Sequence, residues 1–186
     1  VMTDDRICFF TDTGSMYQVK AADVPAGKLK DKGVPLDNIS RFEGAKERIL
    51  LTMPASELPG KKLLFATRAA MLKIVPGGEF LTANRMVAAT KLSEGDQAAE
   101  IRILSGETEI VLQTKEGMFL RFMINEIPEL KKNSRGVRGM KLEGGDSLEH
   151  VYFPENEPLA VYKEKEVHLN RLKMAKRDGK GTKTRV

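Results

Sequence analysis

An internal repeat, with copies 56 and 47 residues apart, constrains the fold of this chain more than any other feature of its sequence. Three segments align residue for residue: 8–17, 64–73 and 111–120. Each copy reads as an apolar strand, a short turn and a second strand, which is the pattern of a tight β-hairpin. The turns end at Gly14, Ala70 and Gly117. Alanine at the second turn predicts either a strain of about 1 kcal/mol, if its φ is positive, or a different turn.

The second half of each unit repeats as well, because residues 85–96 match residues 135–146 at an offset of 50. It begins with a basic residue followed by glycine or apolar residues, and Lys32-Gly33-Val34 is a weaker first copy. It closes in an acidic glycine-rich turn, after which another apolar strand follows, around 49–53, 99–104 and 148–153. Four short strands per unit of about 45 to 55 residues are typical of propeller blades.

We therefore predict an all-β fold of propeller-like blades of about four strands, three of them full and one partial. The repeats are 7–56, 62–106, 109–156 and the partial copy 158–186, within a single domain, 1–186, or a fragment of one. No helix should exceed about two turns. A β-sandwich with long loops and a kelch-type propeller are the alternatives, but four strands at this period fit blades better than Greek keys.

Positive charge gathers in a few segments, although the net charge is only +5. Residues 171–186 carry a net charge of +6 and residues 1–170 a net charge of −1. A nucleic-acid-binding face within 1–170 must therefore come from local clusters of cations. In 131–146, KKNSRGVRGMKLEGGD, five cations precede the first acid, and Gly136 and Gly139 would let the backbone approach a phosphate surface closely. The residues that we predict to bind DNA are Lys28, Lys30, Lys32, Arg68, Lys73, Arg85, Lys131, Lys132, Arg135, Arg138, Lys141, Lys176, Arg177, Lys180, Lys183 and Arg185.

Catalytic and metal sites are not predicted. The two histidines, His150 and His168, fall on predicted strand surfaces, and with one cysteine they exclude the common zinc spacings. No phosphate-binding loop or nucleophile elbow is present, so the chain should need no cofactor of its own. Cys8 lies in an apolar run and is expected to be a buried small hydrophobe. The single cysteine and the absence of a long apolar run predict a cytoplasmic location without membrane contact.

Several segments together resemble the C-terminal DNA-wrapping domain of bacterial type II topoisomerase A subunits, meaning DNA gyrase or topoisomerase IV. They are FFTDTGSMYQVKAADVP, FATRAAMLKIV, VLQTKEGMFLRF and SRGVRGMKLEGGD. The resemblance implies a β-pinwheel whose blades exchange strands and bend duplex DNA around a basic outer rim. It also implies three partners, which are double-stranded DNA, an ATPase B subunit, and the rest of the A subunit, in a bacterial, nucleoid-associated enzyme. ATP and Mg²⁺ would be used by other parts of that enzyme, and this chain by itself should be non-catalytic.

The resemblance leaves the choice of enzyme open, because the glutamine-arginine-glycine box that marks the first blade of gyrase does not occur in this sequence. Family members usually have five or six blades, so the chain looks like a fragment or a shortened member.

Duplex binding through phosphates is the function that the residues favour, and it should not depend on DNA sequence, because cations in glycine-rich loops offer no groove-reading element. A protein-interaction propeller is the alternative. The tail, 171–186, is expected to be mobile and to act as a basic DNA arm; the competing interpretation is that it completes the last blade.

Overall fold

Short strands and turns make up the computed structural model, which describes residues 4–184. Within those residues there is no α-helix, and the longest 3₁₀ turn has four residues. The turns are Ala21–Asp23, Leu36–Asn38, Ala55–Glu57, Gly77–Phe80, Ile124–Glu126 and Leu169–Arg171. The prediction of an all-β fold without long helices is therefore confirmed. No helix in 4–184 is long and apolar enough to cross a membrane.

Three four-stranded antiparallel sheets and one hairpin follow one another along the chain. The first sheet has the order β3-β1-β2-β6, formed by Ile49–Pro54, Arg6–Thr11, Ser15–Lys20 and Met86–Ala88. The second has the order β10-β5-β4-β7, formed by Val137–Arg138, Met71–Pro76, Lys62–Thr67 and Ala98–Leu104. The third has the order β11-β8-β9-β14, formed by Leu148–Tyr152, Glu109–Thr114, Met118–Met123 and Thr182–Lys183. The hairpin pairs β12, Leu159–Tyr162, with β13, Lys165–His168. These are three full blades and a partial one, as predicted.

Each full blade takes its last strand from the next unit of the sequence. β6 follows the second hairpin in the chain but pairs with β2 of the first, and β10 follows the third hairpin but pairs with β5 of the second. In the same way β14, from the tail, pairs with β9. A blade and a sequence repeat therefore differ by one strand, and the exchange links successive blades. This is the strand exchange that the resemblance implied.

The hairpin turns explain the repeated glycine. Gly14, Ala70 and Gly117 all have positive φ, at 79°, 59° and 79°, and the N–H of each donates to the threonine three residues earlier at 3.1, 2.9 and 3.0 Å. Alanine thus adopts the same left-handed turn as the two glycines. The carbonyl of each of these three residues then accepts an N–H from the incoming exchanged segment. Each turn therefore closes its own hairpin and also forms a backbone hydrogen bond with the segment exchanged from the next unit.

The acidic turn of each unit closes the same hairpin from the other side. Asp96 Oδ1 accepts the N–H of Ala69 at 3.0 Å, and Asp146 Oδ1 accepts the N–H of Glu116 at 3.1 Å. In the first unit Glu47 stands at the equivalent position and accepts the hydroxyls of the turn threonines instead. Burial raises the pKa of Glu47, but these hydroxyl donors outweigh it and lower the pKa overall. The acidic turns are therefore structural.

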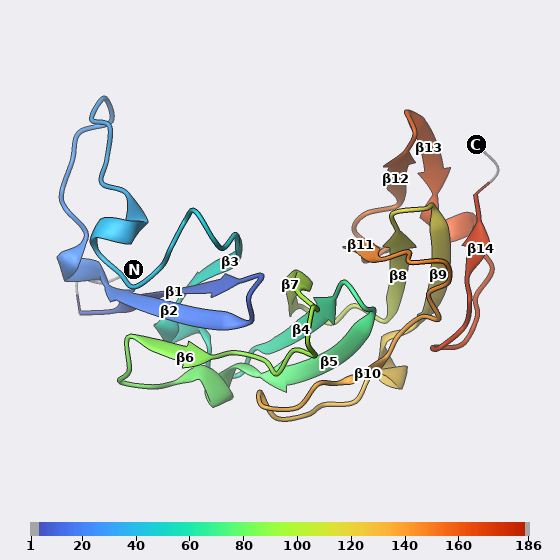
Figure 1. Cartoon of the computed structure of the whole chain (residues 1–186), viewed down its shortest axis with the longest axis horizontal. Helices are drawn as coiled ribbons and strands as arrows, with labels where there is room; N and C mark the ends of the chain where they lie inside the picture. The colour runs from blue at the N-terminus through green and yellow to red at the C-terminus, as the bar shows by residue number, and fades with distance from the viewer. Residues whose placement is uncertain (1–3, 185–186) are drawn as a thin grey trace.

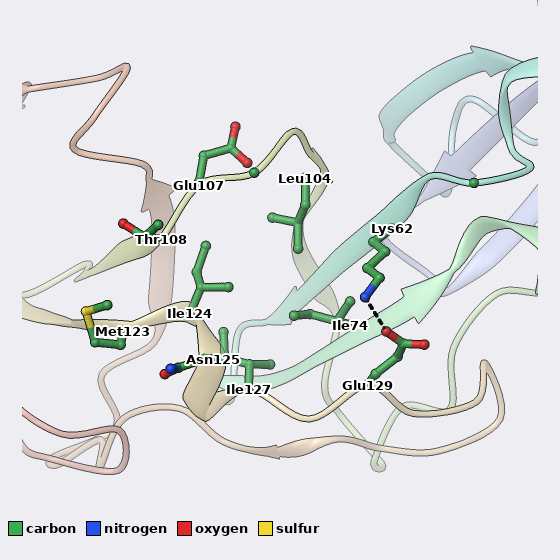
Figure 2. Close-up of a pocket in the computed structure, with 12 residues that line it drawn as sticks. Lys62, Ile74, Leu104, Glu107, Thr108, Met123, Ile124, Asn125, Ile127 and Glu129 are labelled. Atoms are coloured by element: carbon green, nitrogen blue, oxygen red, sulfur yellow. Dashed lines mark ion pairs between the residues drawn. The ribbon is translucent and has the colours of Figure 1, made fainter.

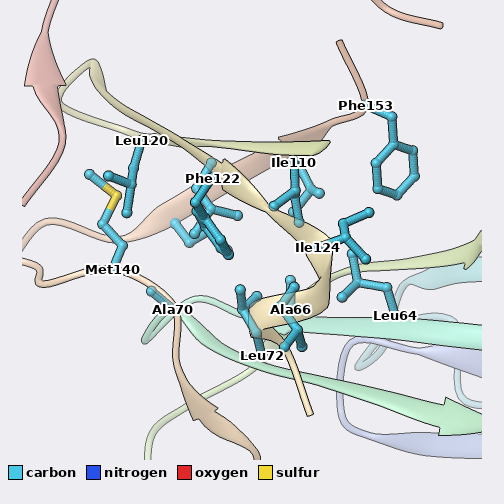
Figure 3. Packing of buried hydrophobic residues seen from close by; sticks show 14 of the residues in the cluster. Leu64, Ala66, Ala70, Leu72, Ile110, Leu120, Phe122, Ile124, Met140 and Phe153 are labelled. Atoms are coloured by element: carbon cyan, nitrogen blue, oxygen red, sulfur yellow. The ribbon is translucent and has the colours of Figure 1, made fainter. Parts of the chain in front are cut away.

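The core lies between blades rather than inside one layer. Along β4, Leu63 and Phe65 face the first blade, whereas Leu64 and Ala66 face the third. This alternation explains why β4 is buried on both faces. The cluster between the first two blades centres on Phe10, whose ring lies 6.3 Å from Phe65 and 5.1 Å from Phe80. The cluster between the second and third blades is mostly aliphatic and contains the rings of Phe122 and Phe153 (Figure 3).

The blades are arranged as an open arc, in which β6, β10 and β14 lie along the convex edge and β3, β7 and β11 along the concave edge (Figure 1). The tail follows the third blade, because Ala175 N donates to Arg121 O at 2.8 Å and Thr184 N donates to Gly117 O at 3.3 Å. The prediction of a mobile arm is therefore wrong as far as Thr184, since the open edge of β9 pairs with the tail. The competing interpretation, that the tail completes the last blade, is right that the tail adds a strand to a blade, but that strand, β14, pairs with β9 of the third blade and not with the partial fourth one.

Candidate nucleic-acid interface

Three crossovers carry cations to the convex edge of the arc. They are 81–88, 128–138 and 172–183, and each ends in an exchanged strand that forms the outer edge of the preceding blade (Figure 1). Arg85 immediately precedes β6 and Arg135 lies just before β10, and both are exposed. An edge strand has one side open to solvent, so cations beside it can reach a large ligand. The repeated basic segments thus come together on one edge.

A polar side chain from the second strand of each hairpin holds the crossover in place. Gln18 Nε2 donates to Thr82 O at 2.8 Å, and Arg121 Nη1 donates to Leu172 O at 3.0 Å. In the second blade Lys73 Nζ donates to the carbonyls of 132 and 134 at 2.6 and 2.7 Å, and to that of 131 at 3.4 Å. Sequence reasoning missed the roles of Gln18 and Arg121. The available signal was a polar residue within an otherwise apolar strand.

Lys73 was predicted to bind DNA, and this is wrong because its side chain is inside the protein, at 1% exposure. Its ammonium lies under the basic loop, 5.4 Å from the centroid of the Phe65 ring. Burial lowers the pKa of Lys73 to about 8, although the nearby carboxylate of Glu79 opposes the shift. Lys73 therefore shapes the loop that presents Lys131 and Arg135.

Replacing Lys73 with methionine should change how stability depends on pH. The folded-state pKa, about 8, is below the unfolded value of 10.5, so the unfolded chain binds more protons between these values. The free energy of unfolding should therefore rise between pH 8 and 9.5, by up to about 1.4 kcal/mol per pH unit from this group. Urea titrations at several pH values should show this rise in the parent and a flatter profile in Lys73→Met. An equal rise in both would mean that Lys73 is not the titrating group.

Other predicted cations are already paired within the protein. Arg138 forms a bidentate pair with Asp178, with Nη2 to Oδ2 at 3.0 Å, and Lys180 lies 2.6 Å from Glu143. Lys132 Nζ donates to the carbonyl of Glu79 at 3.1 Å, and Arg177 Nη1 to that of Arg138 at 2.6 Å. Arg138 was predicted to bind DNA, but the folded tail brings the carboxylate of Asp178, 40 residues away, into an ion pair with it.

Six predicted cations of the convex edge are exposed and belong to none of the ion pairs found in 4–184. They are Arg85, Lys131, Arg135, Lys141, Lys176 and Lys183. Arg68 is partly buried in the second hairpin turn. Lys28, Lys30 and Lys32 lie in an exposed loop that joins no sheet, and Arg185 lies outside the described residues. Of the predicted DNA-binding residues that lie in 4–184, these six therefore remain available to a ligand on the convex edge.

Gly136 and Gly139 were predicted to let the backbone approach a phosphate surface, but in the structure they lie against Leu72 of the preceding hairpin. A Cβ on Gly136 would lie 2.5 Å from the Leu72 carbonyl oxygen, and one on Gly139 would lie 2.4 Å from Leu72 Cδ1. The glycines therefore allow the exchanged strand to approach the preceding hairpin, and their close approach to a phosphate surface is not needed to explain them.

Residues 4–184 contain no cluster of three or more side chains that could hold a metal ion. Cys8 is buried, and burial raises the pKa of its thiol to about 11. His150 and His168 are exposed strand residues, as predicted. The cavity in Figure 2, about 550 Å³, lies between the second and third blades. It is lined by apolar side chains, by Glu107, Thr108 and Asn125, and by the Lys62–Glu129 ion pair at 2.7 Å.

Hairpins joined by exchanged strands, with successive blades set along a curved edge, define a β-pinwheel. The chain belongs to the DNA gyrase C-terminal domain family, described as a β-propeller, whose profile matches residues 5–41, 61–105 and 108–154. Each match falls on one repeat of the sequence, and the first match ends at residue 41, before the end of its repeat.

Curated relatives support this assignment. The DNA gyrase A subunit of Klebsiella oxytoca is 30% identical over 157 residues, which are 83% of this chain and 18% of the relative. The DNA gyrase A subunit of Staphylococcus aureus strain MRSA252 is 29% identical over 193 residues, covering 98% of this chain and 22% of the relative. The chain thus spans about a fifth of the length of these relatives.

Solved structures agree on the fold. The C-terminal domain of DNA topoisomerase IV superposes with a TM-score of 0.84 at 22% identity, over 97% of this chain and 58% of that one. The Escherichia coli ParC C-terminal domain superposes with a TM-score of 0.78 at 19% identity, over 100% of this chain and 78% of that one. The predicted resemblance is confirmed by the gyrase family profile and relatives, and the likeness to the topoisomerase IV domains is one of fold.

Proposed function

We propose that this chain binds duplex DNA through phosphate contacts along its convex edge and bends the duplex, as part of a type II topoisomerase A subunit. The observation that carries the proposal is the strand exchange, because it sets the basic segments of successive units along one curved edge (Figure 1). Exposed lysine and arginine side chains neutralise phosphates without reading base edges.

Binding should be independent of DNA sequence. The 3₁₀ turns in 4–184 have at most four residues, which is too short for a helix that enters the major groove. The unpaired cations lie in crossovers and at strand ends, where they can follow a sugar–phosphate backbone. The contribution of each is small, so several must act on one duplex.

The duplex should bend because the convex edge to which it binds is curved. Deforming a site of 20 to 30 base pairs costs on the order of several kcal/mol, which a single cation cluster does not offset. Cations on the edges of three blades can share that cost, because each contacts the duplex where the arc turns. The fixed arrangement of the blades then sets the path of the DNA.

Removing Lys131 and Arg135 together tests the proposal. The variant Lys131→Ala/Arg135→Ala should bind every duplex sequence more weakly, and the slope of log K against log salt should flatten by about 1.8, because two phosphates lose their cation. Fluorescence anisotropy with several unrelated duplexes, each titrated with salt, measures both quantities. Ligation of nicked circular DNA with the parent chain bound should also give a shift in linking number.

A matched control is Lys46→Ala/Arg48→Ala, two exposed cations on the connection into β3 at the concave edge. This control should keep the parent salt slope. Loss confined to one duplex sequence in the test variant would contradict phosphate recognition. An unchanged slope in the test variant would remove the convex edge from the proposal.

The assembled enzyme provides the setting. In it, ATP and Mg²⁺ would be used by other parts, the partners would be an ATPase B subunit together with the rest of the A subunit, and the location would be the bacterial cytoplasm at the nucleoid. This chain by itself would be non-catalytic.

A further inference from the structure

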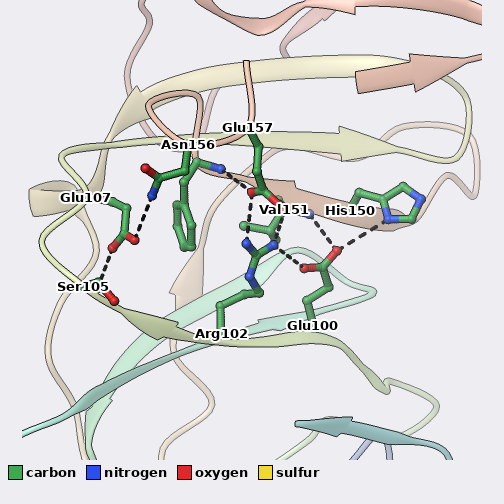
Figure 4. A network of polar contacts seen from close by, with 9 residues as sticks. Glu100, Arg102, Ser105, Glu107, His150, Val151, Asn156 and Glu157 are labelled. Carbon is green, nitrogen blue, oxygen red and sulfur yellow. Dashed lines mark hydrogen bonds and ion pairs between the residues drawn. The ribbon is translucent and has the colours of Figure 1, made fainter. Parts of the chain in front are cut away.

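The open edge of β11 is held by two charged side chains of the neighbouring blade (Figure 4). Val151 N donates to Glu100 Oε1 at 3.1 Å, and Val151 O accepts from Arg102 Nη1 at 3.1 Å. Both partners come from β7 of the second blade, so the N–H and the C=O of one residue of the third blade are each hydrogen-bonded to a charged side chain of the second blade. Hydrogen bonds to charged groups are shorter and stronger than neutral ones, and they depend on direction. We call Glu100 and Arg102 the clasp.

Strand alternation places the clasp at the junction. Glu100 and Arg102 stand opposite Ala66 and Leu64, on the face of the second blade that packs against the third. At the equivalent positions of the first blade, the side chains that face the second blade are Leu51 and Met53. Both junctions share a backbone bond, Ala98 N to Asp12 O and Leu148 N to Arg68 O, each at 2.8 Å. The clasp is therefore an addition at the second junction.

Arg102 also reaches beyond the strand. Its Nη2 lies 3.0 Å from Glu157 Oε2, which accepts the N–H of Phe153 as well, at 3.0 Å. The guanidinium carbon lies 4.9 Å from the centroid of the Phe153 ring, and that ring is buried in the core between the blades. The side chain of Arg102 is 32% exposed and that of Glu100 is 22% exposed, so salt screens the clasp less than a surface pair.

We infer that Glu100 and Arg102 are positioning residues that fix the angle between the second and third blades and thereby set the curvature of the bound duplex. The inference rests on the proposed function. Apolar packing is non-directional and tolerates small rotations, whereas the clasp is satisfied only in one register of β11 against β7. The cations near β10 and β14 belong to the two blades that the clasp joins, so rotation at this junction moves one set relative to the other.

The test variant replaces the two clasp residues with side chains like those at the equivalent positions of the first blade. Glu100→Leu/Arg102→Met copies the side chains of the first junction, and Arg102→Lys keeps the charge but loses the forked geometry. Lys46→Met is the control, because it removes one exposed cation whose ion pair is with Glu43, three residues away. Ligation of nicked circles should show the linking-number shift per bound chain falling by at least about twofold in the double variant, with Arg102→Lys intermediate. The salt slope and affinity should stay within about twofold of the parent.

A second measurement needs no DNA. Spin labels on cysteines replacing Ala69 and Glu116, both exposed at hairpin turns, report the distance between the second and third blades. Double electron–electron resonance between the two labels should give a narrow distance distribution for the parent and a broader or displaced one for the double variant. Labels at Ala45 and Ala69, across the first junction, should give the same distribution in both proteins.

The outcomes separate the two claims. An unchanged distribution between 69 and 116 in the double variant overturns the clasp whatever happens with DNA. A changed distribution with an unchanged linking-number shift overturns its role in curvature. If the parent itself neither binds duplex DNA nor shifts the linking number, the proposed function fails and so does the inferred effect on DNA. The distance measurement then still decides whether the clasp sets the angle between blades.

Discussion

Replacing Gly136 with alanine should lower the free energy of unfolding by about 3–5 kcal/mol, from left-handed strain together with overpacking. Gly136 has a φ of +89°, and a Cβ there would lie 2.5 Å from the Leu72 carbonyl oxygen and 2.9 Å from its carbon. The obstacle is backbone, so it cannot move aside as a side chain could. The exchanged strand β10 would have to leave the second blade, and Arg135 would leave its place at the convex edge.

Gly145 provides the control for this prediction. It has a φ of +76°, but a Cβ there would meet nothing within 4 Å. Gly145→Ala should therefore carry the conformational strain alone, about 1–2 kcal/mol. Urea unfolding followed by circular dichroism compares the two variants. Equal losses would show that the close approach of β10 to Leu72 does not contribute.

Truncation after Leu172 should lower the free energy of unfolding by about 3–5 kcal/mol, because it removes a strand and uncovers buried apolar groups. The segment 173–184 contributes β14 to the third blade. It also covers Met140, which is 1% exposed and whose Cε would lie 2.5 Å from a Cβ added at Gly181. The melting temperature should drop by roughly 10 °C for a chain of this size.

The charge of the tail can be tested apart from its strand. Lys176→Ala/Lys183→Ala removes two exposed cations and leaves the backbone pairing of β14 in place. This variant should keep the melting temperature of the parent and flatten the salt slope of DNA binding by about 1.8. A truncated chain that melts like the parent would show that the tail does not complete the third blade.

The sequence by itself determined the hairpins, their turns and the all-β class. These features depend on neighbours in the chain: alternation sets which side chains share a face, and a positive φ at the turn favours glycine locally. The repeat also predicted the blade count, because each copy carried its own hairpin. Ala70 shows the limit even here, since the sequence left its turn open and the structure shows the left-handed conformation at φ 59°.

Only the tertiary structure decided which cations remain available. Lys73 reads like any other basic residue, yet carbonyls 58 to 61 residues away hold it inside the protein. Arg138 pairs with an acid brought to it by the folded tail, and the tail itself is ordered because β9 has an open edge for it. The clasp likewise joins Glu100 and Arg102 to the backbone of Val151, about 50 residues further along the chain. Such outcomes depend on contacts between distant segments, and a local pattern carries no information about them.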